Sequence, residues 1–174
     1  MIVVRTVKFD SRRERGNEDR GVWRAPRAAE VVELLGGVAQ RWELLEAGLW
    51  PEQIDLSRRY GRIVRVRRGW YASLDTPAPI LRALRAGGRL ACVSAIAWHE
   101  GATIPEPVHV LVQAGASRIR RDGVIVHWSR RQVTGSRTVV SEAEALRQAQ
   151  LIMLGQENRS HPYYWASFIL VGDP

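Results

Sequence analysis

The stretch 31–72, VVELLGGVAQRWELLEAGLWPEQIDLSRRYGRIVRVRRGWYA, decides the expected fold of this 174-residue chain. It continues a helix that Pro26 opens, at a position where the missing N–H of proline costs nothing. Apolar residues follow at helical spacing, and Gly36 and Gly37 end the helix. The residues of this apolar stripe are Ala28, Val31, Val32 and Leu35.

Two more helices are predicted to follow. Val38, Trp42 and Leu45 form a second apolar stripe, and Gly48 ends that segment. Pro51 begins a polar helix that reaches about residue 60.

A two-stranded hairpin is predicted for residues 63–72. Apolar and arginine side chains alternate along IVRVR, which indicates a half-buried strand. Arg68 and Gly69 make the turn, and Trp70 begins the return strand. Helices followed by such a hairpin are the plan of a winged helix-turn-helix, which we assign to residues 26–74.

Arginine is concentrated in the third helix and the hairpin of this unit. In a major groove, Gln53 would pair with adenine and an arginine with guanine, each through two hydrogen bonds. The hairpin arginines would hold phosphates or the minor groove. The predicted DNA-binding residues are Glu52, Gln53, Asp55, Arg58, Arg59, Arg62, Arg65, Arg67 and Arg68. The bland alternative is that residues 58–68 are a solvated face of an ordinary small domain.

Residues 75–154 are predicted to form a small mixed α+β domain, which puts the chain in the α+β class. Pro79 opens a short helix, and Ser94 is expected to cap another. Strands are predicted at 108–112 and 123–128. Ser141 and Glu144 form a capping box before a last helix. The apolar face of that helix is Leu146, Ala149, Ile152 and Met153.

Three further arginines, Arg118, Arg120 and Arg121, lie in the loop between the two predicted strands. Three roles are open for these arginines. They extend the surface that binds DNA, they contact an acidic surface of a partner protein, or they are solvated at the tip of a hairpin.

The two ends of the chain differ from the body. Residues 1–25 are rich in charge and are expected to be a flexible arm, in which Arg12, Arg13 and Arg15 either touch DNA or are solvated. Residues 155–174 form a C-terminal tail without a clear period. Its aromatic residues, which either dock on the body or form a partner surface, are Tyr163, Tyr164, Trp165 and Phe168.

Composition limits the class of protein. Lys+Arg number 26 against 18 Asp+Glu, and the net charge of +8 suggests an anionic partner. The single cysteine, Cys92, excludes an intramolecular disulfide and a multi-cysteine zinc site. No apolar run approaches the ~20 residues of a membrane span, and no secretory signal opens the chain. We therefore expect a cytoplasmic protein that meets no membrane.

The residues predict no catalytic site, no metal site and no cofactor, so we do not expect an enzyme. His109 and His127 lie on separate predicted strands and could meet, but strand histidines are more often partners within a pleated face. Cys92 with a histidine would be a nucleophile pair in principle. Between Ala91 and Val93, it is more often a small core residue.

The stretch 31–72 resembles the N-terminal winged-helix domain of the AbiEi-type antitoxins. The likeness is carried by Gly36-Gly37, Ala47-Gly48-Leu49 and the RRGWYA ending, and it continues to about residue 131. The resemblance implies a regulator of its own operon, often the antitoxin partner of a toxin in a toxin–antitoxin or phage-defence system. Many such proteins carry a C-terminal endonuclease-like domain, which this chain is too short to hold.

We therefore expect a sequence-selective DNA-binding transcription regulator, a repressor on double-stranded operator DNA. An inverted repeat bound by a homodimer is the usual arrangement. Two other functions stay open: an antitoxin that acts mainly by contact with a toxin, and a remnant of a nuclease-fused regulator without catalysis.

Overall fold

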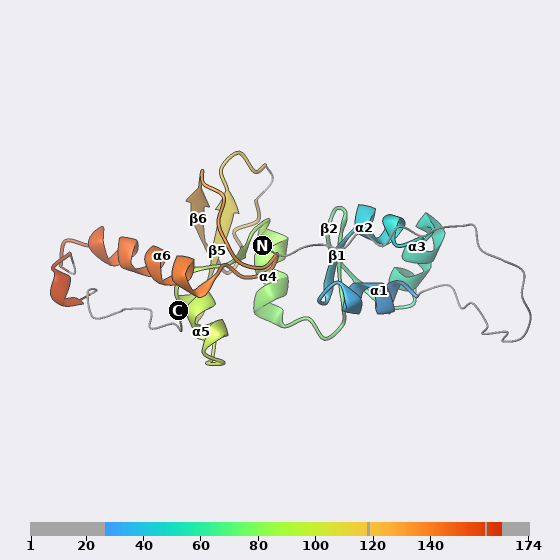
Figure 1. The fold of residues 1–174 in the computed structure, drawn as a ribbon, viewed down its shortest axis with the longest axis horizontal. Coiled ribbons are helices and arrows are strands. Elements are labelled where there is room, and N and C mark those ends of the chain that lie inside the picture. The colour runs from blue at the N-terminus through green and yellow to red at the C-terminus, as the bar shows by residue number, and fades with distance from the viewer. Residues whose placement is uncertain (1–26, 118, 159, 165–174) are drawn as a thin grey trace, which may run out of the picture.

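The computed structural model describes residues 27–164, apart from 118 and 159 (Figure 1). Within this range the chain is α+β, with helices packed on two small sheets. Residues 28–72, here the first unit, hold α1 (Ala28–Leu34), β1 (Val38–Gln40), α2 (Arg41–Glu46), α3 (Pro51–Arg59), β2 (Val64–Arg67) and β3 (Trp70–Ala72).

Residues 78–154, here the second unit, continue the chain towards the opposite end of the molecule (Figure 1). They hold α4 (Ala78–Ala86), β4 (Arg89–Leu90), α5 (Cys92–His99), β5 (Val108–Gln113), β6 (Val124–Ser129) and α6 (Glu142–Leu154). A short 3-10 helix, Pro162–Tyr164, follows.

The sheet of the first unit separates two hydrophobic cores. Its strand order is β1-β3-β2, and both pairings are antiparallel. Ala39 and Tyr71 face the core formed with the three helices of the first unit. Val38 and Ala72, which alternate with them, face the core of the second unit. Both faces of this small sheet are therefore covered.

The second unit is built around β5. Its sheet has the order β4-β5-β6, in which β4 pairs antiparallel and β6 pairs parallel with β5. Helices α4 and α5 both contact β5, and α6 packs on α5. Val108, Val110 and Val112 are fully buried, as expected for a strand covered by helices.

The second predicted helix is wrong in its start and in its buried face. Residues 38–40 form β1, and the helix begins only at Arg41. Leu44 is fully buried, whereas the predicted core residues Trp42 and Leu45 are exposed. Because Val38 lies in a strand, it does not share the helical repeat of α2. A repeat of 3.6 residues counted from Val38 therefore predicts the wrong buried face.

Three local predictions in the second unit are also corrected. Ser94 is not a cap: it lies inside α5, buried, and its hydroxyl accepts a hydrogen bond from the His109 N–H at 2.9 Å. Arg120 and Arg121 do not lie on a hairpin tip, because the strands they connect run parallel. Half of the last capping box forms, since Ser141 accepts from the Glu144 N–H at 3.4 Å.

Glu144 does not complete that box. The Ser141 N–H donates to the Thr134 carbonyl, and Glu144 pairs with Arg147 and Gln148 instead. The helix itself is present, but its buried residues are Ala145 and Gln148. The predicted apolar face lies beside them and is only half-buried at Leu146, Ala149, Ile152 and Met153.

Some predictions lie outside the described residues. These are the arm with Arg12, Arg13 and Arg15, the loop residue Arg118, and the tail residues Trp165 and Phe168. Among the residues that the structure describes, no helix is long and apolar enough to cross a membrane.

Candidate nucleic-acid interface

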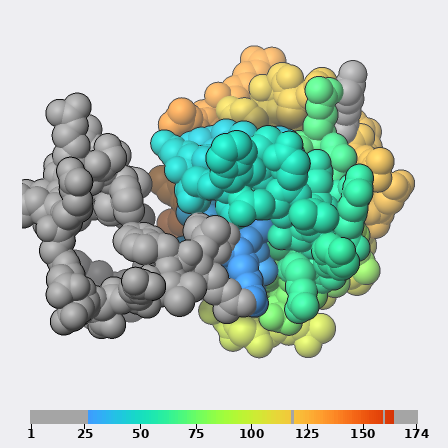
Figure 2. Space-filling view, turned by 90° about the vertical axis from the view of Figure 1, so that its right-hand side faces the viewer, coloured from blue at the N-terminus to red at the C-terminus, as the bar shows by residue number. Residues whose placement is uncertain are grey.

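Helix α3 lies at one end of the molecule, where Figure 2 shows it on the same face as α2 and the residues that follow α3. Its fully buried side chain is Ile54. At 100° per residue, Glu52, Leu56 and Arg59 fall on the side opposite Ile54, and all three are exposed. This outward side of α3 is the surface that a duplex would meet.

Gln53 is placed differently from its predicted role. Its amide oxygen accepts a hydrogen bond from the Trp50 N–H at 2.7 Å and so satisfies one of the free donors at the start of α3. Bidentate pairing with adenine needs that same oxygen together with the amide N–H. To read adenine in this way, Gln53 must share the two lone pairs of its oxygen between the helix terminus and the base, or give up its contact with the helix terminus.

The remaining predicted residues of α3 stay accessible. Arg58 and Asp55 form an ion pair only at 4.0 Å, with both side chains about half exposed. An exposed pair of this length contributes little to stability. The guanidinium of Arg58 is thus free to exchange its partner for a phosphate.

Three of the four predicted arginines in and just before the β2–β3 hairpin are exposed. Arg62 lies two residues before β2, Arg65 lies in β2 and Arg68 lies in the turn. The exposed arginines of α3 and of this segment are called the five-arginine surface below: Arg58, Arg59, Arg62, Arg65 and Arg68.

Arg67 does not belong to this surface. The pairing of β2 with β3 shifts between Arg65 and Arg67, which is a β-bulge, and a bulge turns the residue after it out of the alternation. Its guanidinium lies 4.8 Å from the centre of the Trp70 ring and close to Gly87, the residue that follows α4. Burial lowers the pKa of Arg67, and its Nε has no hydrogen-bond partner among the described residues.

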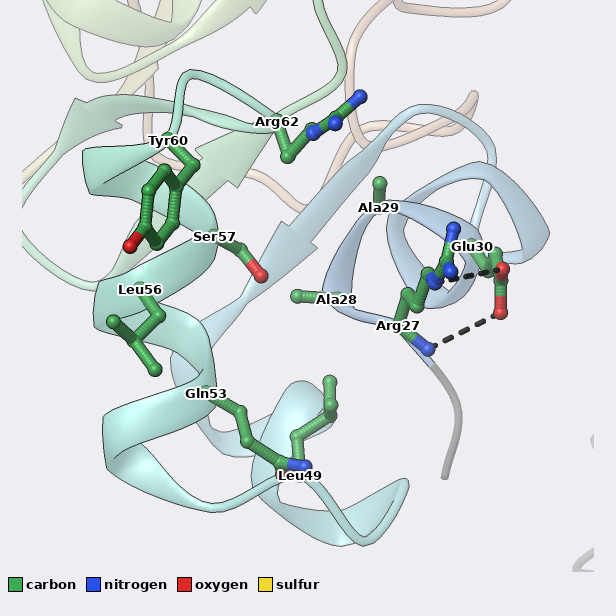
Figure 3. Close-up of a pocket in the computed structure, with 10 residues that line it drawn as sticks. All are labelled: Arg27, Ala28, Ala29, Glu30, Leu49, Gln53, Leu56, Ser57, Tyr60 and Arg62. Carbon is green, nitrogen blue, oxygen red and sulfur yellow. Dashed lines mark hydrogen bonds and ion pairs between the residues drawn. The ribbon is translucent and has the colours of Figure 1, made fainter. Parts of the chain in front are cut away.

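A shallow cavity of about 590 Å³ separates α3 from the start of α1 (Figure 3). Ser57 and Gln53 lean toward α1, while Leu56 and Tyr60 point away from it. Arg27 and Glu30 pair with each other on the α1 side, at 4.0 Å. The cavity holds Arg62 at one edge but no convergent set of polar groups.

Sequence reasoning missed the exposed aromatic and aliphatic residues around α3. Trp50 and Tyr60 are more than two-thirds exposed, and Leu56 is about half exposed. The apolar period offered a signal, because Ile54 and Leu56 cannot share one helix face. These side chains add apolar contact area beside the arginines.

Arg120 and Arg121 are exposed in the connection between β5 and β6. That connection belongs to the second unit, whereas the five-arginine surface belongs to the first unit.

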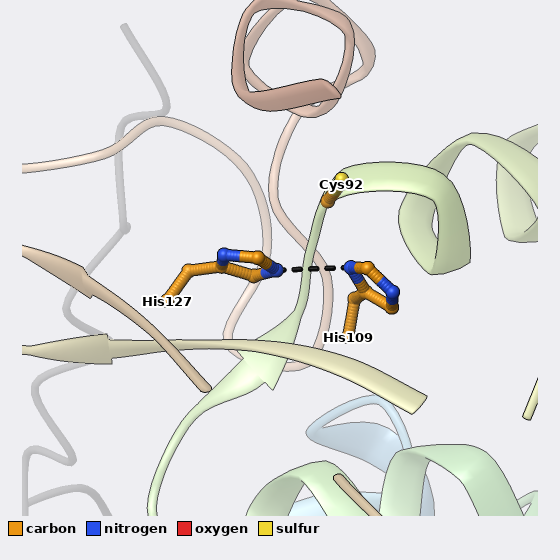
Figure 4. A group of neighbouring side chains, drawn as sticks. All are labelled: Cys92, His109 and His127. Atoms are coloured by element: carbon orange, nitrogen blue, oxygen red, sulfur yellow. Dashed lines mark hydrogen bonds between the residues drawn. The ribbon is translucent and has the colours of Figure 1, made fainter. Parts of the chain in front are cut away.

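One cluster of potential metal ligands lies in the second unit, at a distance in sequence from the arginines. His109 Nδ1 and His127 Nε2 are 2.9 Å apart, and Cys92 lies beside them at the start of α5 (Figure 4). One ligand atom from each of the three residues lies within 4.8 Å of the others. The two histidines, which the sequence left free to meet, are in contact. Cys92, which the sequence analysis paired with a histidine only as a nucleophile in principle, lies beside both.

The comparisons with known proteins give one family match. The model of the CHAT domain, a caspase-like protease family, matches residues 132–173. That segment is about a quarter of the chain and contains none of Cys92, His109 and His127, so it does not place the chain in that family. No curated protein matches the chain.

The expected membership of the AbiEi-type antitoxins is wrong, because the family model that matches is that of the CHAT domain. The residues that carried the likeness are glycines at helix ends and an arginine-glycine turn. At Gly36, Gly48 and Gly69 the φ angle is positive, so a turn explains each glycine without common descent. The antitoxin role and the toxin partner depended on that likeness and are not carried further.

Proposed function

We propose that the protein is a sequence-selective DNA-binding transcription regulator and that it binds double-stranded DNA through the first unit. One observation carries the proposal: five arginines are exposed on α3 and on the hairpin that follows it. An overall net charge of +8 agrees with an anionic partner.

We further propose that the first unit is a winged helix-turn-helix. Its order of helix, strand, helix, helix and two strands supports this, as does the placement of β3 between β1 and β2. In that plan α3 enters the major groove, and the β2–β3 hairpin is the wing.

The five-arginine surface then divides by role. Arg58 and Arg59, in the last turn of α3, are the candidates for guanine contacts in the groove. Arg62, Arg65 and Arg68 are the candidates for phosphate contacts, which set affinity and register more than sequence. Arg67 is left out, because its guanidinium packs against Trp70.

Glu52 and Leu56 are proposed to select bases beside the arginines. A carboxylate at Glu52 can accept a hydrogen bond from the cytosine amino group, and an exposed leucine can contact a thymine methyl group. Two copies on an inverted repeat would place two α3 helices about one turn of DNA apart.

Salt dependence of binding to a labelled duplex tests the phosphate contacts. If Arg62, Arg65 and Arg68 each neutralise one phosphate, the logarithm of the binding constant falls against log salt with a slope of about −2.7. The double variant R65A/R68A should change this slope by about 1.8 toward zero and weaken all sequences alike.

The matched control is R130A/R131A, which removes the same charge from two exposed arginines of the second unit. It should leave the slope within about 0.5 of the wild-type value. Equal slopes for the two double variants would mean that net charge, and not the five-arginine surface, binds DNA, and the proposal would fail.

Selection from a random duplex library tests sequence preference. The wild type should enrich an inverted repeat with half-sites about 10 base pairs apart. R59A should lose preference at one base pair of each half-site, at a cost of about 1–3 kcal/mol. Enrichment of no motif would limit the protein to non-specific binding.

A further inference from the structure

The second unit contains a constellation that the proposed DNA binding does not use. Cys92 comes from the first residue of α5, His109 from β5 and His127 from β6 (Figure 4). Since β5 and β6 are parallel and in register, His109 is opposite Ile125 and His127 is opposite Leu111. The two histidines are thus diagonal neighbours on one face of the sheet, which α5 covers at Cys92.

We propose that Cys92, His109 and His127 bind a divalent transition metal of the zinc type. One thiolate and two imidazoles are ligands that Zn²⁺ prefers, whereas Mg²⁺ and Ca²⁺ require oxygen ligands. The three ligand atoms lie within 4.8 Å of one another. Zn–N and Zn–S bond lengths in a tetrahedral site place ligand atoms about 3.3–3.6 Å apart, so closure needs shifts of about 1 Å.

The backbone at Cys92 supports a role beyond packing. Cys92 has a φ of +51°, the left-handed region, and among the described residues it is the only non-glycine residue with a positive φ. Glycine would relieve that strain, and a small core residue needs no thiol. Cys92 lies at the start of α5, beside the histidine pair (Figure 4).

Neighbouring groups hold the backbone at two of the three residues. The Cys92 backbone N–H donates to the Gln148 amide oxygen at 3.2 Å, and the Gln148 amide donates to Glu144 at 2.8 Å. The His109 backbone N–H donates to the Ser94 hydroxyl at 2.9 Å.

Metal binding by Cys92 exchanges a proton for the metal: the S–H bond breaks, an S–metal bond forms, and H⁺ leaves to solvent.

A fourth ligand can come from solvent. His127 and Gln148 line a cavity of about 510 Å³ between β6 and α6, together with Arg130, Arg131 and Arg147. A water molecule or an anion drawn by these arginines can complete a tetrahedral shell through this cavity.

Cobalt titration of the full-length, chelator-treated protein tests the proposal. One equivalent of Co²⁺ should give a tetrahedral visible spectrum with a thiolate charge-transfer band, and Zn²⁺ should displace it. C92S should lose the charge-transfer band, while H109Q and H127Q should each weaken cobalt binding by more than about 10-fold. H161Q changes a histidine outside the cluster and should bind like the wild type.

X-ray absorption of the zinc-loaded wild type provides a second measurement that does not depend on folded variants. It should show one sulfur and two imidazole ligands at the zinc. Octahedral cobalt, a shell without sulfur, or wild-type spectra in C92S would each overturn the proposal. None of these readouts depends on DNA, so failure here is separate from failure of DNA binding.

Discussion

The two units place their polar groups in opposite ways. The first unit exposes five arginines on one helix and one hairpin, and its core is purely apolar apart from Tyr71. The second unit encloses a thiol and two half-buried imidazoles among helices and strands. An exposed charge acts through long-range electrostatics and tolerates small movements, whereas a bound metal fixes the distances between its ligand atoms.

The two units also differ in the hydrogen bonds at the starts of their helices. In α1, α2 and α3 the third residue, Glu30, Glu43 or Gln53, accepts a hydrogen bond from the N–H that precedes the helix. In α6 it is Ser141, before the helix, that accepts from the N–H of Glu144. The helices of the first unit therefore depend on side chains that point back along the chain.

Replacement of Gly88 by alanine is expected to have the largest effect on stability. A Cβ at this position would lie 2.1 Å from the Leu111 carbonyl oxygen and 2.7 Å from Val110 Cγ1, so the β4–β5 region must shift. We expect a loss of about 4 kcal/mol or more in the free energy of unfolding, measured by urea denaturation.

The control for this prediction is Gly155→Ala. Its nearest neighbours are at 3.6 and 3.7 Å and its φ is −76°, so alanine fits without strain. G155A should match the wild type or exceed it by a few tenths of a kcal/mol. A loss of less than about 1 kcal/mol in G88A would show that β4 and β5 are loosely packed. The second unit would then not be the tightly packed region that this comparison requires.

Leu44→Ala tests the buried face of α2. Leu44 is fully buried and Leu45 is 40% exposed, although the two residues are adjacent and chemically identical. L44A should cost about 3 kcal/mol, and L45A about 1 kcal/mol or less. Thermal unfolding of both variants provides the comparison. A larger loss in L45A than in L44A would show that Leu45, as predicted from the sequence, belongs to the buried face of the helix.

The sequence predicts those elements of this fold that depend on neighbouring residues in the chain, and not those that depend on distant contacts. The apolar period and the glycine pair of α1, the proline start of α3 and the apolar run of β5 are local, and those elements are where they were expected. Strand β1 was not predicted, because three residues carry no period and form a strand only by pairing with β3.

The candidate sites show the same limit. The positions of the hairpin arginines can be read directly from the sequence. The bulge that turns Arg67 inward has no sequence pattern that predicts it. The contact between His109 and His127 was foreseeable from two strands. The position of Cys92 beside them depends on how α5 crosses the sheet, which is a tertiary property.

The ion pair of Glu43 and Arg137 links the two units and offers the third prediction. Arg137 donates to both carboxylate oxygens of Glu43, at 2.7 and 2.9 Å, and to the Val38 carbonyl at 3.1 Å. E43Q removes the charge but keeps an oxygen for the Gln40 N–H. We expect a loss of about 1–2 kcal/mol at neutral pH. E30Q, in an exposed pair at 4.0 Å, should lose about 0.5 kcal/mol or less.

The same pair predicts a pH dependence. Burial by itself raises the pKa of Glu43, but the hydrogen bonds from Arg137 and Gln40 and the charge of Arg137 hold it below its ordinary value of 4.5. A lowered pKa in the folded state adds stability that is complete above 4.5 and is lost as the pH falls through the folded pKa. The difference between wild type and E43Q should therefore shrink as the pH falls below 4.5 in urea titrations. A difference that stays constant down to about pH 3 would contradict the linkage.

Gln53 carries the smallest predicted effect and decides between two roles for one amide. Its oxygen accepts from the Trp50 N–H at 2.7 Å, and leucine cannot replace that contact. Q53L should lose about 0.5–1 kcal/mol, whereas Q53E keeps an acceptor at a helix start that favours negative charge and should match the wild type. Chemical denaturation measures the stability, and duplex selection measures base preference for the same two variants. If Q53E keeps full stability and full base preference, the amide serves the helix and not the DNA, because a glutamate cannot donate to adenine N7. Loss of preference at an adenine in Q53E would instead show that Gln53 leaves its contact with Trp50 when DNA binds.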